Sequence, residues 1–182
     1  MRTNVHDLLA GQALARPDAP ALSYKNVTSS YDQTWGAARA AAAQLQTLGL
    51  DRGERVAIYL EKRFETVAAM FATSAADGVF VPINHVLKPP QVGHILVDSG
   101  ATFLVTSADR LGQLTAILPG SSVTTVIVVG EVIPDAPGDY AVHGWNAGQA
   151  AGAAPRVHKA IDIDPAAILY TSGSTGKPKG VV

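Results

Sequence analysis

The sequence contains no cysteine among its 182 residues. This absence excludes a disulfide framework, thiolate metal sites and a cysteine nucleophile, and it fits a reducing compartment. No stretch approaches the ~18 consecutive apolar residues that span a bilayer. Residues 1–15 end in small residues as a secretion signal does, but His6, Asp7 and Gln12 interrupt the apolar run that such a signal needs. We therefore expect a cytoplasmic protein without a transmembrane segment.

The sequence also lacks a charge excess of either sign. Fourteen basic residues stand against fifteen acidic ones, which gives a net charge of -1. A chain so nearly neutral has no broad field to attract nucleic acid or anionic lipid. We expect no nucleic-acid partner, and any bound polyanion must be held by a local cluster of groups.

The histidines lack the spacing of a metal site. None of the five is followed by another at the short intervals that metal ligands require. We therefore assign no metal to them and expect isolated surface or loop residues. They are His6, His85, His94, His143 and His158.

The middle of the chain alternates between two hydrophobic periods. Short apolar runs predict buried strands, and the segments between them carry apolar residues at helical spacing, as at Phe64, Val67 and Phe71. Gly78 and Gly100 stand where two of these helices would end. The alternation predicts an α/β fold with a mostly parallel sheet flanked by helices. The predicted strands are 55–60, 79–83, 102–106 and 123–129, and the predicted helices are 64–75, 89–99 and 109–118.

The flanking regions are less regular. A hairpin that turns at Lys25 and Asn26 is predicted upstream, followed by an alanine-rich helix over 32–48. Residues 130–162 are rich in glycine, alanine and proline, which predicts a long connection with a short helix near 143–150.

The last segment has the composition of an anion-binding loop. A strand predicted over 166–171 precedes the sequence SGSTGKPKGVV, residues 172–182. Gly173, Gly176 and Gly180 can adopt positive φ and let the backbone approach a phosphate. The hydroxyl groups and two lysines of this segment can donate to phosphate oxygens.

Two other interpretations of this segment are weaker. A flexible Gly/Ser linker does not explain the apolar strand before it or the proline between Lys177 and Lys179. The phosphate loop of nucleoside-triphosphate hydrolases needs four residues between its glycines and a hydroxyl residue after its lysine. Here the spacing is shorter, Pro178 follows Lys177, and the residues after it indicate an extended chain.

The motif YTSGSTGKPKGV, residues 170–181, closely resembles the phosphate-loop signature of adenylate-forming enzymes, which include acyl-CoA ligases, peptide-synthetase adenylation domains and luciferases. The segments RGERVAIYL, AADGVFVPIN and HILVDSGATFLVTS are similar to early segments of that family in the same order. The segment SSYDQTW fits less well, because the family often has Glu-Leu where Gln33 and Thr34 stand.

The resemblance implies an enzyme that uses ATP, Mg²⁺ and coenzyme A to activate a small-molecule carboxylic acid. Within it, Lys179 is the predicted catalytic residue that stabilises the leaving pyrophosphate, Ser174 is the predicted magnesium contact, and Lys177 is auxiliary. The subclass that it most resembles is a bacterial acyl-CoA ligase of the fatty-acid type, including those that accompany exosortase systems. The predicted nucleotide-binding residues are Thr171, Ser172, Gly173, Ser174, Thr175, Gly176, Lys177, Lys179 and Gly180.

The resemblance covers the chain but only about the first third of a family member. We therefore expect an N-terminal fragment, inactive by itself, with an α/β subdomain over 1–164 and a strand plus phosphate loop over 165–182. A homodimer is compatible with this expectation. Two alternatives stay open, an adenylation domain for an aryl or amino acid and a non-catalytic nucleotide- or phosphate-binding module.

Overall fold

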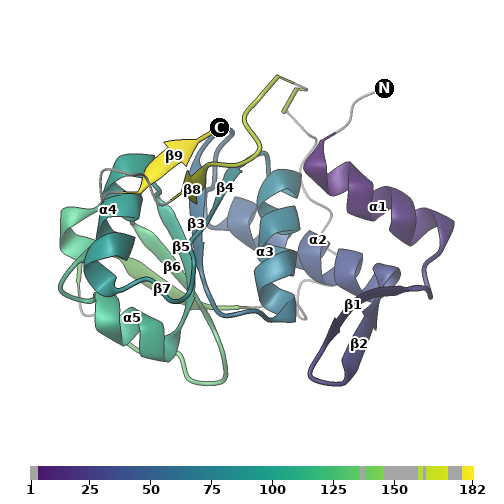
Figure 1. Ribbon diagram of the computed structural model, residues 1–182, viewed down its shortest axis with the longest axis horizontal. Helices are drawn as coiled ribbons and strands as arrows, with labels where there is room; N and C mark the ends of the chain where they lie inside the picture. Colours follow the sequence, from purple (N-terminus) through teal and green to yellow (C-terminus); the bar gives the residue numbers. More distant parts are fainter. Residues whose placement is uncertain (1–3, 136–137, 146–159, 162, 172–177) are drawn as a thin grey trace. The chain divides into compact units, whose positions relative to one another are not determined.

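A computed structural model gives the fold of the chain (Figure 1). Its described residues group into two compact units. The first unit is drawn from residues 1–53, 62–78 and 146–166. The second unit is drawn from residues 54–61, 79–145 and 167–182. Only the described residues of these ranges are meant. The predicted boundary after residue 164 stays a prediction. The structure describes residues 4–135, 138–145, 160–161, 163–171 and 178–182.

The first unit contains three helices and a hairpin. The hairpin turns at Lys25 and Asn26, whose φ angles of 48° and 63° are those of a two-residue turn that matches strand twist. This confirms the predicted hairpin. The elements are α1 (Val5–Ala15), β1 (Pro20–Tyr24), β2 (Val27–Ser30), α2 (Tyr31–Thr47) and α3 (Phe64–Ala75).

Helix α2 confirms the predicted alanine-rich helix. Ser30 caps its first turn, where the Gln33 N–H donates to Ser30 Oγ and the Ser30 N–H donates to Gln33 Oε1. Its small residues Ala38 and Ala42 are fully buried, and α2 packs against α3. Among the described residues, no helix has the length and apolarity to cross a membrane.

An ion pair in the first unit joins residues distant in sequence. Arg52 Nε and Nη2 each donate to a carboxylate oxygen of Asp164 over 2.8 Å. The Ile161 N–H also donates to this carboxylate, over 3.0 Å. The hydrogen bond from Arg52 is the largest cause that holds the pKa of Asp164 below its usual range.

The second unit is built on a five-stranded parallel sheet with the strand order β4-β3-β5-β6-β7. This confirms the predicted α/β fold with a mostly parallel sheet. The strands are β3 (Arg55–Tyr59), β4 (Val79–Pro82), β5 (Phe103–Ser107), β6 (Thr125–Val129) and β7 (Ala141–Gly144). The helices are α4 (Pro89–Ser99), α5 (Ala108–Leu114) and the 3₁₀ turn η1 (Leu118–Gly120).

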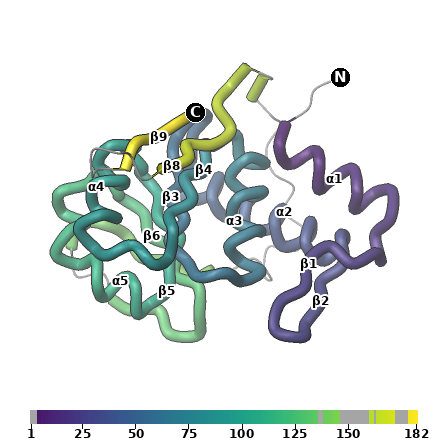
Figure 2. The backbone as a smooth tube through the Cα atoms, in the orientation of Figure 1, coloured from purple at the N-terminus to yellow at the C-terminus, as the bar shows by residue number. Residues whose placement is uncertain are grey.

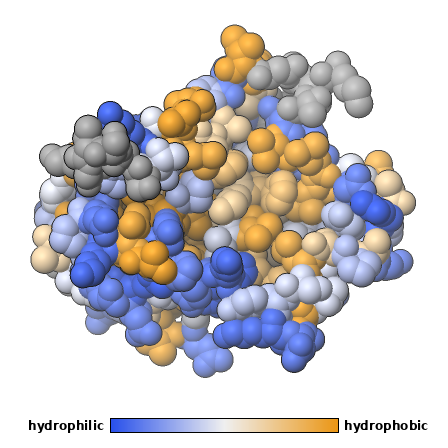
Figure 3. Space-filling view, viewed as in Figure 1, coloured by the Kyte–Doolittle hydropathy of each residue, from blue (hydrophilic) through white to orange (hydrophobic). Residues whose placement is uncertain are grey.

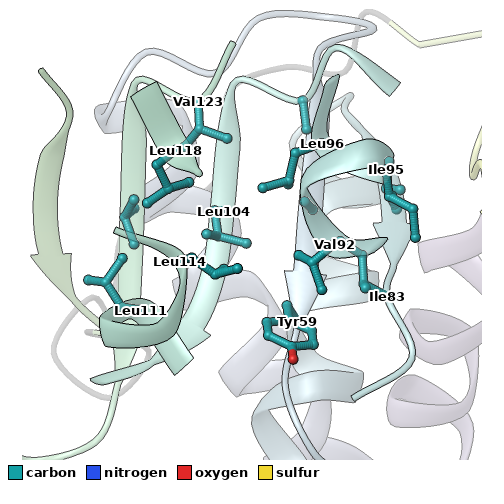
Figure 4. Close-up of a cluster of buried hydrophobic side chains, with 14 of the residues drawn as sticks. Tyr59, Ile83, Val92, Ile95, Leu96, Leu104, Leu111, Leu114, Leu118 and Val123 are labelled. Carbon is teal, nitrogen blue, oxygen red and sulfur yellow. The ribbon is translucent and has the colours of Figure 1, made fainter. Parts of the chain in front are cut away.

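One hydrophobic cluster fixes α4 and α5 to this sheet (Figure 4). Val92, Ile95 and Leu96 of α4 are 0% exposed and lie in the cluster with Leu104 of β5. Gly100 then ends α4 in the left-handed region, with φ of 59°, as predicted from its position. Burial of each large apolar side chain stabilises the folded state by about 1.5–3 kcal/mol. Helix α4 is therefore held in place by its buried face, and residues that contact its exposed face contact a well-anchored helix.

Some predicted elements are wrong. Residues 143 and 144 belong to strand β7 and Trp145 to no helix, contrary to the predicted helix near 143–150, whose residues 146–150 lie outside the described residues. The predicted helix 109–118 is shorter, since α5 ends at Leu114 and the separate 3₁₀ turn η1 begins at Leu118. Pro119 has no amide hydrogen to donate to the residue 115 carbonyl, which disfavours a continuous α-helix through this point. Helix α1 was not predicted, and its His6 is only 4% exposed, contrary to a surface or loop residue.

We predict that Asp164→Asn makes the stability of the protein less sensitive to acid. Because the pKa of Asp164 is lower in the folded chain, its carboxylate stabilises the fold above the unfolded value of about 3.9. That stabilisation is lost as the pH falls through the folded pKa. Melting temperatures measured from about pH 6 to about pH 2 should fall less in the variant than in the wild type.

The exposed Asp18→Asn serves as the matched control and should keep the wild-type dependence. If Asp164→Asn shows the same loss of melting temperature with acid as the wild type, the ion pair does not contribute to stability.

Candidate functional site

The predicted anion-binding segment is carried by a short hairpin. Strands β8 (Leu169–Thr171) and β9 (Lys179–Val181) pair antiparallel, with Thr171 opposite Lys179. Because residues 172–177 lie outside the described residues, the predictions for Ser172, Gly173, Ser174, Thr175, Gly176 and Lys177 lie outside them too. The predicted positions that the structure describes are Thr171, Lys179 and Gly180.

The hairpin is attached to the edge of the parallel sheet. Ala167 forms a parallel bridge with Phe80 of β4, and the Ile168 N–H donates to the Phe80 carbonyl over 3.0 Å. The chain therefore enters β8 directly from the sheet edge. The predicted strand over 166–171 is shorter than expected, since the regular strand begins at Leu169.

The residues after the loop are extended. Lys179–Val181 form strand β9, as the sequence indicated for the residues that follow Pro178. A phosphate loop of the nucleoside-triphosphate hydrolase kind continues into a helix at this point. The described geometry therefore counts against that alternative.

Thr171 and Lys179 stand at the end of the hairpin from which residues 172–177 emerge. Residues directly opposite in an antiparallel pair project from the same face of the hairpin, with Cβ atoms about 4.5–5.5 Å apart. Both residues are exposed. Within the described part of the chain, no carboxylate lies within ion-pair distance of Lys179. A hydroxyl donor and a cation are thus available to an anion at the base of the loop.

Gly180 does not have the expected positive φ, and its nucleotide contact stays a prediction. It lies in extended β9 and is not among the described glycines with positive φ. A Cβ atom at Gly180 would lie 2.9 Å from Ile168 Cγ2 and 3.1 Å from Tyr170 Cζ. Glycine is therefore needed here to leave room for the side chains of the opposite strand.

Tyr170 joins the hairpin to helix α4. Its hydroxyl donates to Asp98 Oδ2 over 2.6 Å, a short bond of the charge-assisted kind. Burial, followed by the Asp98 carboxylate, raises the pKa of Tyr170 well above its usual value. The hydroxyl therefore keeps its proton and remains a donor throughout the physiological pH range.

Helix α4 lies beside strand β9 (Figure 2), and His94 makes a second contact between α4 and the hairpin. With its proton on Nε2, it donates to the Pro178 carbonyl over 3.1 Å. Instead of an isolated surface or loop residue, His94 is thus a half-buried helical residue with a backbone partner. The contacts of His94, Asp98 and Tyr170 could not be predicted from the sequence, because their partners lie more than 70 residues away.

The hairpin also exposes apolar surface. Leu169, Val181 and Val182 are 52%, 56% and 80% exposed. Figure 3 shows apolar surface where β9 ends. Among the described residues of the hairpin, Thr171 and Lys179 at its loop end offer polar contacts to an anion.

Comparison with protein families finds a match over most of the chain. The family described as AMP-binding enzyme matches residues 9–182. The chain is 36% identical over 155 residues to an L-proline--[L-prolyl-carrier protein] ligase of Streptomyces coelicolor, covering 84% of this chain and 29% of that protein. It is 35% identical over 167 residues to the fatty acid--[acyl-carrier-protein] ligase ScoC of Streptomyces coeruleorubidus, covering 91% of this chain and 30% of that protein.

Solved structures agree with this match. The anthranilate CoA ligase AuaEII in complex with anthranoyl-AMP superimposes with a TM-score of 0.81 at 25% identity, covering 99% of this chain and 34% of that one. The N-terminal domain of FACL13 from Mycobacterium tuberculosis gives 0.77 at 28% identity, covering 100% of this chain and 44% of that one. The chain thus spans less than a third of the length of the two curated relatives named above.

We predict that Gly180→Ala loosens the hairpin. The added methyl group must displace Ile168 or Tyr170, and overpacking of this kind costs about 1–3 kcal/mol. Amide hydrogen exchange over residues 167–182 should become faster by about tenfold, while exchange in β5 stays unchanged. Gly112→Ala in α5 is the control, because a Cβ there meets nothing within 4 Å. Unaltered exchange in Gly180→Ala would show that the hairpin tolerates the side chain.

Proposed function

The chain belongs to the AMP-binding enzyme family, and we propose that it supplies the phosphate-binding loop of an ATP-dependent ligase. A carboxylate is a poor electrophile at neutral pH. In the proposed reaction, a carboxylate oxygen attacks the α-phosphorus of ATP, the bond from that phosphorus to the bridging oxygen breaks, and pyrophosphate leaves. The resulting acyl-adenylate then passes its acyl group to a thiol and releases AMP.

The observation that carries this proposal is the position of Lys179 at the base of the loop. Its ammonium group has no carboxylate partner within the described residues, and Thr171 lies opposite it. Negative charge accumulates on the pyrophosphate as it leaves. A fixed cation at that point stabilises the transition state more than the ground state, which is the requirement for catalysis.

We propose that the rest of the loop binds the phosphates through backbone and hydroxyl donors. Backbone N–H groups of Gly173–Gly176 and the hydroxyls of Ser172 and Thr175 would complete the nucleotide contacts, with Lys177 in an auxiliary role. These residues lie outside the described part of the chain, so their assignment rests on the family signature.

Magnesium supplies charge neutralisation on the phosphates when it is bound. Among the described residues, no group of three or more His, Asp or Glu side chains is arranged to hold a metal. Magnesium at such sites is usually bound by one or two protein oxygens together with the substrate phosphates. We propose Ser174 as its protein contact.

The thiol acceptor is proposed to be coenzyme A. The structural similarity to the anthranilate CoA ligase supports this choice. The second candidate is the thiol of a carrier protein, which is supported by the carrier-protein ligases among the relatives. Thioester formation with coenzyme A in one reaction and with a thiol-bearing carrier protein in another distinguishes the two.

We propose a fatty acid as the activated substrate. The similarity to ScoC, named as a fatty acid ligase, supports this class. An amino acid is the second candidate, since the prolyl-carrier protein ligase has a comparable identity. A cytoplasmic location, which a cysteine-free chain fits, and a homodimer are further parts of the proposal.

We predict that Lys179→Ala slows acid-dependent exchange of pyrophosphate into ATP by about 10²-fold, the effect of one charge-assisted contact in the transition state. The assay uses the natural protein that contains this chain and a panel of fatty, aryl and amino acids. Lys62→Ala removes an exposed lysine elsewhere and should retain wild-type exchange.

Unchanged exchange in Lys179→Ala would remove this lysine from the mechanism. A wild-type protein that binds ATP but shows no exchange with any acid would favour the non-catalytic nucleotide-binding alternative.

A further inference from the structure

Helix α4 presents two polar side chains to the hairpin. His94 and Asp98 are four residues apart, which places them one above the other on the same face of the helix. Each of them contacts a different arm of the hairpin. Asp98 holds Tyr170 in the arm before residues 172–177, and His94 holds Pro178 in the arm after them.

The contact to the first arm lies close to the loop. Tyr170 is separated from the first loop residue by Thr171 alone. The bond of 2.6 Å from its hydroxyl to Asp98 Oδ2 fixes the position of the ring over Gly180. The Tyr170 side chain thus bonds β8 to α4 and also packs against Gly180 of β9.

The contact to the second arm is made at Pro178, the residue directly after the loop. Pro178 follows the last residue of the 172–177 segment and has no backbone N–H. Its carbonyl is therefore the only backbone group through which this residue can be held by a hydrogen bond. His94 Nε2 donates to that carbonyl over 3.1 Å.

The helix that carries both contacts is itself held firmly. Val92, Ile95 and Leu96 are fully buried in the core of the second unit (Figure 4). A Cβ added at Gly93 would lie 2.5 Å from Ile117 Cγ2, so the helix backbone closely approaches that side chain. The positions of His94 and Asp98 are therefore fixed by the core.

We propose that His94 and Asp98 are positioning residues that hold the two described arms of the hairpin at a fixed separation, so that Thr171 and Lys179 meet the phosphates in one arrangement. This inference rests on the proposed function of the loop. The two contacts settle the ends of the loop before ATP binds, which lowers the entropy lost when the donors engage an anion. The hairpin register by itself determines which residues of the two arms are paired, but not where the hairpin lies relative to α4.

The test is a double-mutant cycle on Asp98 and Tyr170 in the natural protein that contains this chain. Asp98→Ala and Tyr170→Phe should each lower the rate constant of acid-dependent pyrophosphate exchange by about tenfold, with little change in KM for the acid. The double variant should lose no more than either single variant, because both remove the same contact. Asp98→Asn retains an acceptor oxygen and should recover part of the rate.

His94 is tested with two substitutions. His94→Ala should reduce exchange about threefold to tenfold, as expected for one hydrogen bond. His94→Gln places an amide donor near the position of Nε2 and should restore most of the activity. Asp135→Asn removes an exposed carboxylate in the same unit and should leave the kinetics unchanged.

Three outcomes would overturn the inference while the proposed function stands. They are wild-type exchange in both Asp98→Ala and Tyr170→Phe, additive losses in the double variant, or an equal rise of KM for the acid and for ATP, which would indicate general loosening of the fold.

If the wild type exchanges pyrophosphate with no acid, the proposed function fails and the inference is judged by binding alone. Calorimetry with pyrophosphate should then give about tenfold weaker binding for Asp98→Ala and for Tyr170→Phe than for the wild type. Equal affinities, or no binding by the wild type, would overturn the inference as well.

Discussion

The antiparallel register that sets Thr171 opposite Lys179 is the constraint on which the candidate site depends. Side chains alternate between the two faces of a strand, so a slip of one residue would move Lys179 to the other face. Tyr170 lies opposite Gly180 in this register, and a Cβ at Gly180 would lie 3.1 Å from Tyr170 Cζ, so a larger residue there requires the ring to move. The face from which Lys179 projects thus depends on the pairing of these two strands.

The contacts that hold this hairpin in place all come from its own unit. The Ile168 N–H is bonded to β4, and two side chains of α4 bond to the two arms. All of these contacts lie within the second unit, whose parallel sheet and hydrophobic cluster hold β4 and α4 in place. Buried, hydrogen-bonded elements therefore support both described arms of the hairpin, and a rigid support of this kind favours the precise placement of groups that the proposed phosphate site needs.

The sequence predicted the architecture well where hydrophobic patterns are strong. Strands such as Arg55–Tyr59 and Thr125–Val129 are short and almost continuously apolar, which is typical of buried strands in a parallel sheet. Strand β7 was missed because its four residues, AVHG, are only partly buried and carry no apolar run. Helix α1 was missed because Leu8 and Leu14 are exposed on it, which obscures its amphipathic pattern.

The site could be predicted only in part. The motif predicts Lys179 and the loop from residue types and spacing, since phosphate binding needs glycines, hydroxyls and cations close together in the chain, and their role stays a prediction. The sequence suggested flexibility at Gly180, whereas the structure shows that the glycine accommodates Tyr170. Asp98 and His94 carried no local signal, because their contacts are set by the packing of α4 beside β9 and not by neighbouring residues.

The central claim, that a carboxylate attacks the α-phosphorus of ATP at this loop, is tested most directly by following the carboxylate oxygen. The natural protein containing this chain is incubated with ATP, magnesium, coenzyme A and an acid whose carboxylate carries a heavy oxygen isotope. The attacking oxygen stays on phosphorus when the acyl group leaves, so the account predicts AMP that contains one heavy oxygen for each turnover. AMP that carries oxygen from water alone would contradict it.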